Sequence, residues 1–270
     1  MSGAGNDFII IDDRKGALSA VEPSLARALC SRHQGIGADG LLIVRQSLQA
    51  MFMMKYYNAD GSFGGMCGNG GRCIARYAFL KGLAPTSMTF EALDYVYSAQ
   101  VDGVSVHLTM KNVNSKCRQQ KIQSASSTIE GWLVDSGSPH FVTFVDCLDD
   151  VDVFNQGRFL RSHSSVGADG ANINFVQRLG QDTIGMRTYE RGVEDETLAC
   201  GTGAVASALA FAIRSGTGSP VSVAVQSGEK LTVSFSKSDG IFTNVRLSGS
   251  AHVLFTGRVS IDHSRCSLSL

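Results

Sequence analysis

The chain contains Arg32-His33-Gln34-Gly35-Ile36-Gly37-Ala38-Asp39-Gly40 and, 130 residues later, Ser162-His163-Ser164-Ser165-Val166-Gly167-Ala168-Asp169-Gly170. Two more pairs keep the same order: Cys67-Gly68-Asn69-Gly70 recurs as Cys200-Gly201-Thr202-Gly203, and Ser2-Gly3 before an apolar run recurs as Ser136-Gly137. Three segments repeated at nearly one offset indicate two homologous halves. We assign residues 1–115 and 116–270 to them, and allow for the last strand packing back on the N-terminal half.

Composition limits the class of protein. Of 270 residues, 43% are hydrophobic, 18% are charged and 30 are glycine, which is typical of a turn-rich globular chain with room for one or two cores. Lys+Arg and Asp+Glu are 24 each. This neutral balance, with no basic run, argues against binding nucleic acid or a membrane surface. No apolar stretch approaches the ~18 residues of a membrane span. The first residues do not resemble a signal peptide, so we expect a cytoplasmic protein whose seven cysteines are reduced.

Hydrophobic patterning predicts many strands and few helices. Helices are expected at residues 22–33, 70–81 and 204–215, and the last is apolar nearly all round, so we expect it to be buried. A polar stretch at residues 111–128 is expected to connect the halves. The predicted class is therefore α+β, with one central helix in each half. Strands are expected at residues 8–11, 41–44, 51–57, 104–108, 141–145, 221–225, 231–235 and 252–255.

Each half places a cysteine before a Gly-x-Gly turn and a helix. A helix start offers unpaired N–H groups that bind anions, and its dipole lowers the pKa of a cysteine located there. If the halves pair about a pseudo-twofold axis, Cys67 and Cys200 would face a bound molecule from opposite sides. Inverting a stereocentre needs a base on one face of a carbon and an acid on the other, and two thiols can fill both roles.

Other interpretations of these cysteines are weaker. A single cysteine is more often a small core residue, but two at equivalent repeat positions reverse that expectation. The Cys67 turn lacks the Lys-Ser/Thr ending of a phosphate loop, and no C-x-x-C motif supports a redox protein. A noncatalytic binding module has no use for paired cysteines. Cys73 fits either a resolving thiol or helix packing. The other cysteines and the six scattered histidines fit no metal-ligand spacing, so we expect no metal site.

Several motifs resemble those of diaminopimelate epimerases over nearly the whole chain. They are Gly3-Ala4-Gly5-Asn6-Asp7-Phe8, Asn58-Ala59-Asp60-Gly61-Ser62, Met66-Cys67-Gly68-Asn69-Gly70, Pro139-His140, and Glu190-Arg191-Gly192 followed by Glu196-Thr197-Leu198-Ala199-Cys200-Gly201-Thr202-Gly203. The resemblance implies a cofactor-independent isomerase that converts LL- to meso-diaminopimelate on the route to lysine and peptidoglycan. It also implies a homodimer, and two pseudo-symmetric halves, each a mostly antiparallel sheet wrapped around a central helix, with the active site in the cleft between them.

The resemblance assigns roles to individual residues. Cys67 and Cys200 would be the acid/base pair, with His140 and Glu190 near the reacting amino group. N–H groups around Gly68, Asn69, Gly201 and Thr202 would hold the reacting carboxylate. The distal amino-acid end of the substrate would be read by Asn6, Asn58, Asn172 and Arg191, because a guanidinium binds a carboxylate bidentately.

The sequence departs from the family pattern at three places. Only Met1-Ser2 precedes the opening motif, where a strand is usual; Gly40 replaces the usual glutamine, and Ser138 the usual asparagine. A site with fewer polar partners rejects analogues less strongly, which suggests slow racemisation of a second amino acid such as glutamate. The alternative activity is that of a proline- or hydroxyproline-type two-cysteine racemase. Glu190-Arg191-Gly192 favours diaminopimelate, since a long substrate needs a cation for its far end.

Overall fold

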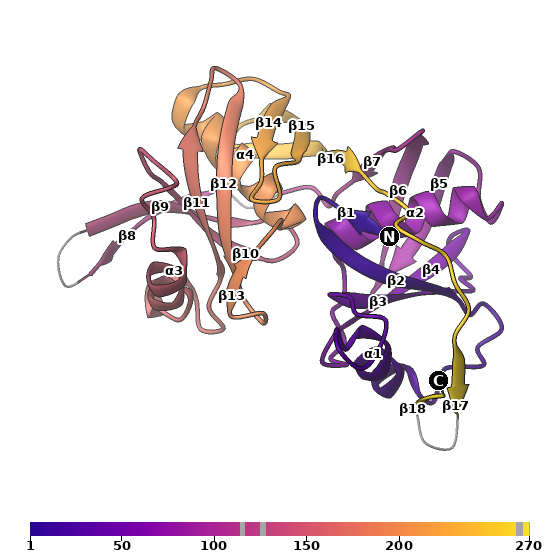
Figure 1. Cartoon of the computed structure of the whole chain (residues 1–270). Coiled ribbons are helices and arrows are strands. Elements are labelled where there is room, and N and C mark those ends of the chain that lie inside the picture. The colour runs from indigo at the N-terminus through magenta and orange to yellow at the C-terminus, as the bar shows by residue number, and fades with distance from the viewer. Residues whose placement is uncertain (114–116, 125–127, 263–266, 270) are drawn as a thin grey trace. The chain divides into compact units, whose positions relative to one another are not determined.

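The computed structural model describes residues 1–113, 117–124, 128–262 and 267–269. The chain forms two compact units, which are described separately (Figure 1). Unit 1 comprises Met1–Leu108 and Gly249–Leu270, and unit 2 comprises Thr109–Ser248. The division of the repeat at residues 115 and 116 concerns homology rather than compactness, and it stays a prediction.

Unit 1 is built on a mixed sheet in which neighbouring strands follow the order β1-β2-β3-β4-β5-β6-β7. The strands are β1 (Ser2–Gly3), β2 (Asn6–Asp12), β3 (Gly40–Arg45), β4 (Phe52–Asn58), β5 (Ser87–Ala92), β6 (Tyr95–Asp102) and β7 (Ser105–Thr109). Helix α2 (Gly68–Leu80) packs against β1, β2, β3, β4 and β6, and α1 (Glu22–Cys30) covers β3 and β4. A separate pair, β17 (Ser260–Asp262) and β18 (Ser267–Ser269), lies beside α1.

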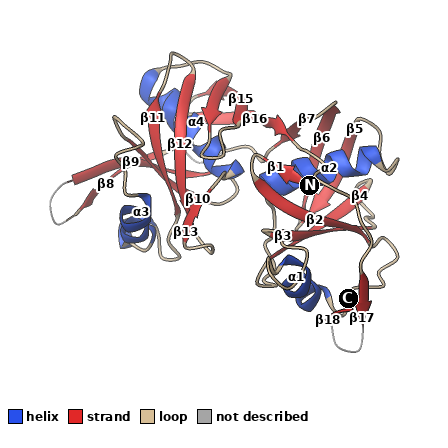
Figure 2. Cartoon of the chain, in the orientation of Figure 1, coloured by secondary structure: helices blue, strands red, loops and turns tan. Residues whose placement is uncertain are grey.

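Unit 2 has the same plan, and its sheet order is β16-β15-β14-β12-β11-β10-β9-β8. The strands are β8 (Arg118–Gln123), β9 (Thr128–Asp135), β10 (Pro139–Phe144), β11 (Asn172–Arg178), β12 (Thr183–Glu190), β13 (Asp195–Thr197), β14 (Val221–Ala224), β15 (Lys230–Ser238) and β16 (Ile241–Ser250). Helix α4 (Gly201–Ser215) packs against β9 to β12, β14 and β15. Helix α3 (Val153–Arg161) covers β11 and β12, and a 3₁₀ turn, η1 (Ser164–Val166), follows it (Figure 2).

The strands of the two units repeat one pairing pattern. In unit 1, β2 pairs parallel with β3, β3 antiparallel with β4, β4 parallel with β5, and β5 antiparallel with β6. In unit 2 the same four relations join β10, β11, β12, β14 and β15. In both units one helix comes after the first strand of this pattern, β2 or β10, and a second comes after the third strand, β4 or β12. The predicted α+β class with two pseudo-symmetric halves is confirmed.

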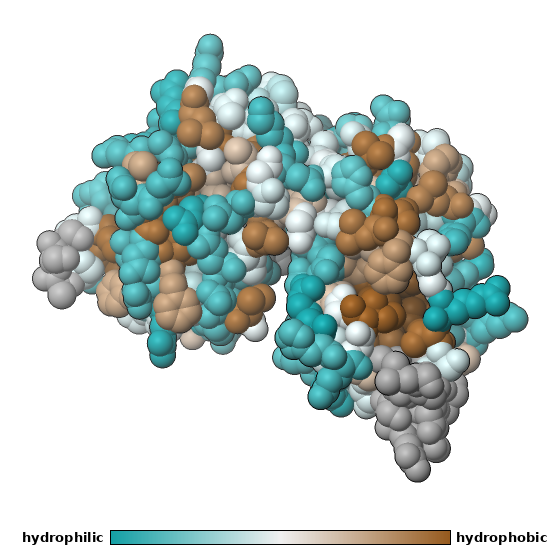
Figure 3. All heavy atoms as spheres, in the orientation of Figure 1, coloured by the Kyte–Doolittle hydropathy of each residue, from teal (hydrophilic) through white to brown (hydrophobic). Residues whose placement is uncertain are grey.

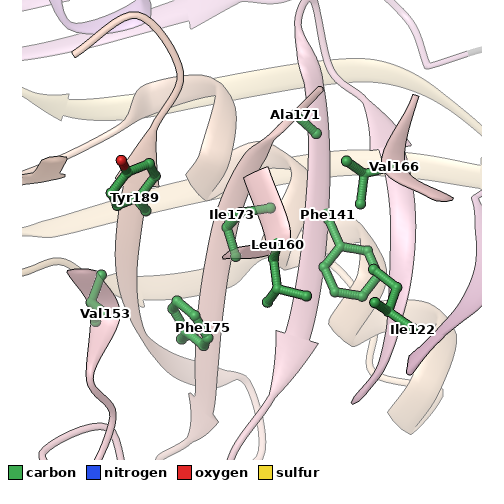
Figure 4. Close-up of a cluster of buried hydrophobic side chains, with 9 residues drawn as sticks. All are labelled: Ile122, Phe141, Val153, Leu160, Val166, Ala171, Ile173, Phe175 and Tyr189. Carbon is green, nitrogen blue, oxygen red and sulfur yellow. The ribbon is translucent and has the colours of Figure 1, made fainter. Parts of the chain in front are cut away.

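The core of unit 2 explains which side chains face α4. A buried cluster joins α3 to the sheet (Figure 4). It includes Ile173 and Phe175 of β11. Because successive side chains of a strand point to opposite faces, Asn172 and Asn174 lie on the other face, the one that α4 covers. The members are Ile122, Phe141, Val153, Leu160, Val166, Ala171, Ile173, Phe175 and Tyr189.

The central helix α4 forms where the sequence predicts it. Alanine-rich and apolar all round, it is buried along most of its length, as expected. It ends at Gly216, whose φ of 69° is the left-handed conformation that favours glycine as a helix cap.

Other elements differ from the sequence prediction. The polar stretch 111–128 is not a plain connection, because it contains β8, in which only Ile122 is buried. Residues 252–255 form no strand; His252 makes a single bridge to Ser2 and the next three residues are exposed. The prediction missed α3, which begins at the cap Asp152. In that helix Gly157 lets the Tyr189 side chain approach so closely that a Cβ at position 157 would lie 2.4 Å from the Tyr189 Cβ and 2.6 Å from its ring.

The surface carries both polar and apolar side chains, as the composition of the sequence leads one to expect. Hydrophilic and hydrophobic side chains are interspersed on the face shown in Figure 3. Within the described residues, no helix combines the length and the hydropathy needed to cross a membrane.

Candidate active site

Cys67 caps the first turn of α2 in unit 1. Its backbone is extended, and its Sγ accepts a hydrogen bond from the Gly70 N–H at 3.4 Å. The sulfur also lies 3.8 Å from Asn6 Oδ1, which in turn accepts a hydrogen bond from Asn69 Nδ2 at 3.3 Å. Cys67 is half-buried, and the helix start beneath it supplies N–H groups at Gly68 and Asn69. We call Cys67, Asn6, Asn69, Asp39 and Asn58 the Cys67 half-site.

An ionic network holds Asn6. Asn6 Nδ2 donates to Asp39 Oδ2 at 2.6 Å, and Arg32 bridges Asp39 and Asp7 at 2.6 and 3.0 Å. Partial burial by itself would raise the pKa of Asp7, but hydrogen bonds from Arg32 and from the Asp39 N–H outweigh it and lower that pKa. The hydrogen bond to Asp39 turns the Asn6 NH₂ group toward that carboxylate and leaves the Asn6 oxygen facing Cys67.

Asn58, at the end of β4, is oriented by Tyr56. The Tyr56 hydroxyl donates to Asn58 Oδ1 at 2.6 Å, and Asn58 Nδ2 donates to Ser62 Oγ at 3.0 Å. A Cβ at Gly40 would lie 2.5 Å from the Tyr56 ring, and one at Gly64 would lie 2.3 Å from it. The ring therefore fills the space beside Gly40, where the family pattern has a glutamine, and brings a hydroxyl group to Asn58.

Cys200 caps α4 in unit 2 in the same way. Its Sγ accepts from the Gly203 N–H at 3.4 Å, the distance found at Cys67, but Cys200 is buried. The sulfur also lies 3.6 Å from the Thr202 hydroxyl. Ser136 Oγ donates to the Thr202 carbonyl at 2.8 Å and ties this turn to the sheet. We call Cys200, Thr202, Ser138, His140, Asn174 and Thr188 the Cys200 half-site.

His140 is fully buried beside this turn. Its Nε2 lies 3.0 Å from the Thr202 hydroxyl and 3.1 Å from the Ser138 hydroxyl, and its Nδ1 lies 2.9 Å from Asn174 Nδ2. Burial lowers the pKa of His140 to about 3; the charge of Arg191 adds to this effect, and the Asn174 hydrogen bond opposes it. The imidazole is therefore neutral at physiological pH.

The other predicted residues of unit 2 gather at the ends of β11 and β12. Asn172 is buried; its Oδ1 accepts from the Arg191 N–H at 2.9 Å and its Nδ2 donates to the Pro139 carbonyl at 3.1 Å. Glu190 Oε2 accepts from the Thr197 hydroxyl at 2.9 Å. The Arg191 guanidinium makes a 3.5 Å contact with the Gly170 carbonyl, and none of the ion pairs between described residues includes it.

Some residues that carry potential chemistry lie outside both half-sites. Cys73 is fully buried on α2, and burial raises the pKa of its thiol to about 12, so packing is its role. The described residues contain no cluster of side chains that could hold a metal ion. A cavity of about 730 Å³ near β8 and β9 includes Trp132 and Phe144 in its lining but no predicted site residue.

Sequence reasoning missed Tyr56, Asn174 and Thr188. It also did not single out Asp39, which bonds Asn6, although the repeated Gly-Ala-Asp-Gly segment contains this residue and was an available signal for it.

Comparison with protein families decides the relationship. Residues 1–116 and 132–245 match the family described as diaminopimelate epimerase. The chain belongs to the diaminopimelate epimerase family. Members are epimerases of the lysine pathway that act without a cofactor, so this chain is an isomerase.

Individual diaminopimelate epimerases resemble the chain over almost its whole length. The protein from Chlorobaculum tepidum is 43% identical and covers 97% of this chain and 100% of its own length; the one from Aquifex aeolicus is 39% identical over 96% of each. Among solved structures, a hydroxyproline epimerase from Agrobacterium vitis superposes with a TM-score of 0.69 at 15% identity, over 92% of this chain and 87% of its own. That likeness concerns the fold alone.

Proposed function

We propose that the chain converts LL-diaminopimelate to meso-diaminopimelate, with Cys67 and Cys200 as the acid/base pair. The observation that carries the proposal is the equivalence of the two thiols. Each caps the central helix of its unit, and each sulfur accepts a hydrogen bond from the third residue of that helix at 3.4 Å. Identical placement suits two groups that exchange roles when the reaction runs backwards.

The proton bookkeeping is simple. The thiolate of one cysteine removes the α-proton and becomes a thiol, and the C–H electron pair stays on the α-carbon. The thiol of the other cysteine delivers its proton to the opposite face and becomes a thiolate. The step requires the two units to present their sulfurs to opposite faces of one carbon. N–H groups at Gly68, Asn69, Gly201 and Thr202 hold the α-carboxylate as negative charge spreads onto it.

The rest of the substrate is held by residues of the Cys67 half-site and by residues at the ends of β11 and β12. The Arg191 guanidinium binds the distal carboxylate, and Asn6, Asn58 and Asn172 read the distal end. Glu190 lies near the reacting amino group. Because His140 Nε2 is within hydrogen-bond reach of Ser138 and Thr202, the imidazole acts mainly through these hydroxyls.

The test is epimerisation of LL-diaminopimelate in deuterium oxide under reducing conditions. Wild type should incorporate solvent deuterium at one α-carbon. Cys67→Ser and Cys200→Ser should each slow conversion by about 10²- to 10⁴-fold, the usual contribution of a general acid or base. Cys147→Ser, at a half-buried cysteine outside both half-sites, is the matched control and should keep the wild-type rate. A reduced wild type that is inactive on diaminopimelate but racemises proline would favour the alternative activity.

Slow racemisation of glutamate is a second, lesser activity of the same proposal. Ser138 offers less polar reach than asparagine would, so a shorter substrate is penalised less, whereas the Tyr56 ring fills the space beside Gly40 and brings a hydroxyl group there. Enantiopure L-glutamate should lose optical rotation with concentrated enzyme, and not with the Cys200→Ser variant. Unchanged rotation with wild type refutes this activity.

A further inference from the structure

We propose that Asn174 and Thr188 are positioning residues of the Cys200 half-site, which fix the tautomer of His140 so that the Thr202 hydroxyl donates to Cys200. The inference rests on the proposed function only for its consequence in catalysis. The arrangement itself can be measured without substrate.

The first step is the orientation of the Asn174 amide. The Thr188 hydroxyl donates to Asn174 Oδ1 at 2.9 Å, so the amide oxygen faces Thr188 and the NH₂ group faces His140. An NH₂ group can only donate. His140 Nδ1, 2.9 Å from it, must therefore be the acceptor, and the one hydrogen of the neutral imidazole sits on Nε2.

The second step runs from His140 to the sulfur. The Nε2–H group faces the hydroxyls of Thr202 and Ser138 at 3.0 and 3.1 Å, and both can accept from it. The Ser138 hydroxyl also lies 3.2 Å from the Thr202 hydroxyl, and either can donate to the other. When the Thr202 oxygen accepts from Nε2–H and from Ser138, its own hydrogen points to Cys200 Sγ at 3.6 Å. Two donors, Thr202 O–H and Gly203 N–H, then converge on the sulfur, and hydrogen bonds to a charged form stabilise it. The arrangement favours the Cys200 thiolate.

Unit 1 shows that the scaffold does not need this polar chain. Asn174 pairs with Thr188 between β11 and β12, and the pair in the corresponding register between β3 and β4 is Leu42 and Tyr56, since Leu42 and Asn174 are each the third residue of their strand. A Cβ at Gly203 would lie 2.5 Å from Asn174 Oδ1, and one at the equivalent Gly70 would lie 3.1 Å from Leu42 Cδ2. The same contact beneath a catalytic helix is therefore met by a leucine in one unit and by an asparagine in the other.

Burial strengthens the argument. Asn174 is 0% exposed and Thr188 1%. Polar side chains this deep are retained when they are hydrogen-bonded, and here a leucine would satisfy packing alone. The titratable and charged groups near this turn are His140 on β10, Glu190 on β12 and Arg191 just after it; the test variants leave all three in place.

The experiment compares the pH dependence of alkylation at Cys67 and Cys200 within the same protein. In substrate-free enzyme, two-dimensional ¹⁵N NMR of histidine-labelled protein reports the His140 tautomer, and mass spectrometry follows alkylation of Cys67 and Cys200 by iodoacetamide against pH. Thr188→Val and Asn174→Leu remove the orienting groups, the latter by copying Leu42. Thr143→Val is the matched control, because Thr143 is also a buried threonine of unit 2 and its hydroxyl donates to the Glu130 carbonyl, away from His140 and Cys200.

We expect wild type and Thr143→Val to show the Nε2–H tautomer. Thr188→Val and Asn174→Leu should populate the Nδ1–H form and raise the pH midpoint of Cys200 alkylation by about one unit, a tenfold rate loss below the midpoint, with the Cys67 midpoint unchanged. Thr188→Ser keeps the hydroxyl and should restore both readouts.

An unmoved Cys200 midpoint in both variants overturns the inference, and so does an equal shift at Cys67. If a variant fails to fold, the wild-type tautomer alone decides, because an Nδ1–H His140 contradicts the chain of donors. Failure of the proposed function looks different: wild type would be inactive on diaminopimelate while these substrate-free readouts stood.

Discussion

The Cys67 and Cys200 half-sites share a frame and differ in what surrounds it. Both sulfurs cap a helix at the same distance from the same turn position. Around Cys67 the partners are amides backed by the ion pairs of Arg32, whereas around Cys200 they are hydroxyls and a neutral imidazole. Each unit places its thiol in the same way, and unlike surroundings make the two thiols chemically unequal. The proposed substrate, LL-diaminopimelate, would react at one of its two centres, and unequal half-sites suit such a reaction.

The largest effect should come from removing what the half-sites share. We expect a sample with Cys67 and Cys200 joined by a disulfide to lose all measurable activity, because the oxidant takes two electrons and two protons and leaves neither acid nor base. Diamide treatment, peptide mapping of the bond and the deuterium assay check this. Dithiothreitol should restore the rate, and full activity in a bridged sample contradicts the two-thiol mechanism.

Exchanging the residue beneath the helix should break the comparison in unit 1. Leu42→Asn places an amide at the position that corresponds to Asn174. Its neighbours there are Phe8 and Tyr56, which occupy the positions of His140 and Thr188 in unit 2. The buried amide lacks their hydrogen bonds, so the free energy of unfolding should fall by about 3 kcal/mol. Urea denaturation measures this loss. Asn174→Leu, the reverse exchange, should cost clearly less, and an equal loss for both would show that the two positions are not equivalent.

Part of this comparison was open to sequence analysis and part was not. The caps of Cys67 and Cys200 are local patterns, a cysteine followed by Gly-x-Gly and an apolar helix, and repetition made them visible. Asn174 and Thr188 become partners only through the pairing of β11 with β12, which no spacing reveals. For the same reason the Tyr56 ring over Gly40 could not be foreseen, and the alteration at position 40 looked like a simple loss. Strand β8 was missed in the sequence because a strand with one buried side chain shows no alternation of polar and apolar residues.

As pH falls, the stability contributed by His140 of unit 2 should be lost at a higher pH than that contributed by Asp7 of unit 1. The pKa of His140 is about 3 in the folded state, against about 6.5 unfolded, so the unfolded chain binds the extra proton between these values and stability falls as pH falls. The loss attributable to His140 at pH 5 should be about 2 kcal/mol. The pKa of Asp7 is lowered too, so its contribution is lost only below its unfolded value near 4.

Urea denaturation at pH 7.5 and pH 5 measures the difference. His140→Phe, which copies Phe8 of unit 1, should remove most of this pH dependence. An unchanged pH dependence in that variant would mean that other groups cause it.

The smallest effect should come from the Tyr56 hydroxyl. Tyr56→Phe keeps the ring that fills the space beside Gly40 and removes the 2.6 Å hydrogen bond to Asn58. One neutral hydrogen bond contributes about 1 kcal/mol, so KM for diaminopimelate should rise about fivefold. Because Asn58 is proposed to read the distal end of the substrate, far from the reacting carbon, kcat should stay near wild type. Tyr95→Phe, at an exposed tyrosine of β6, is the control and should change neither constant. A fall in kcat with KM unchanged would instead place Tyr56 next to the reacting centre. The hydroxyl would then act on the reaction at the α-carbon, as the cysteines do, and not on binding of the distal end of the substrate.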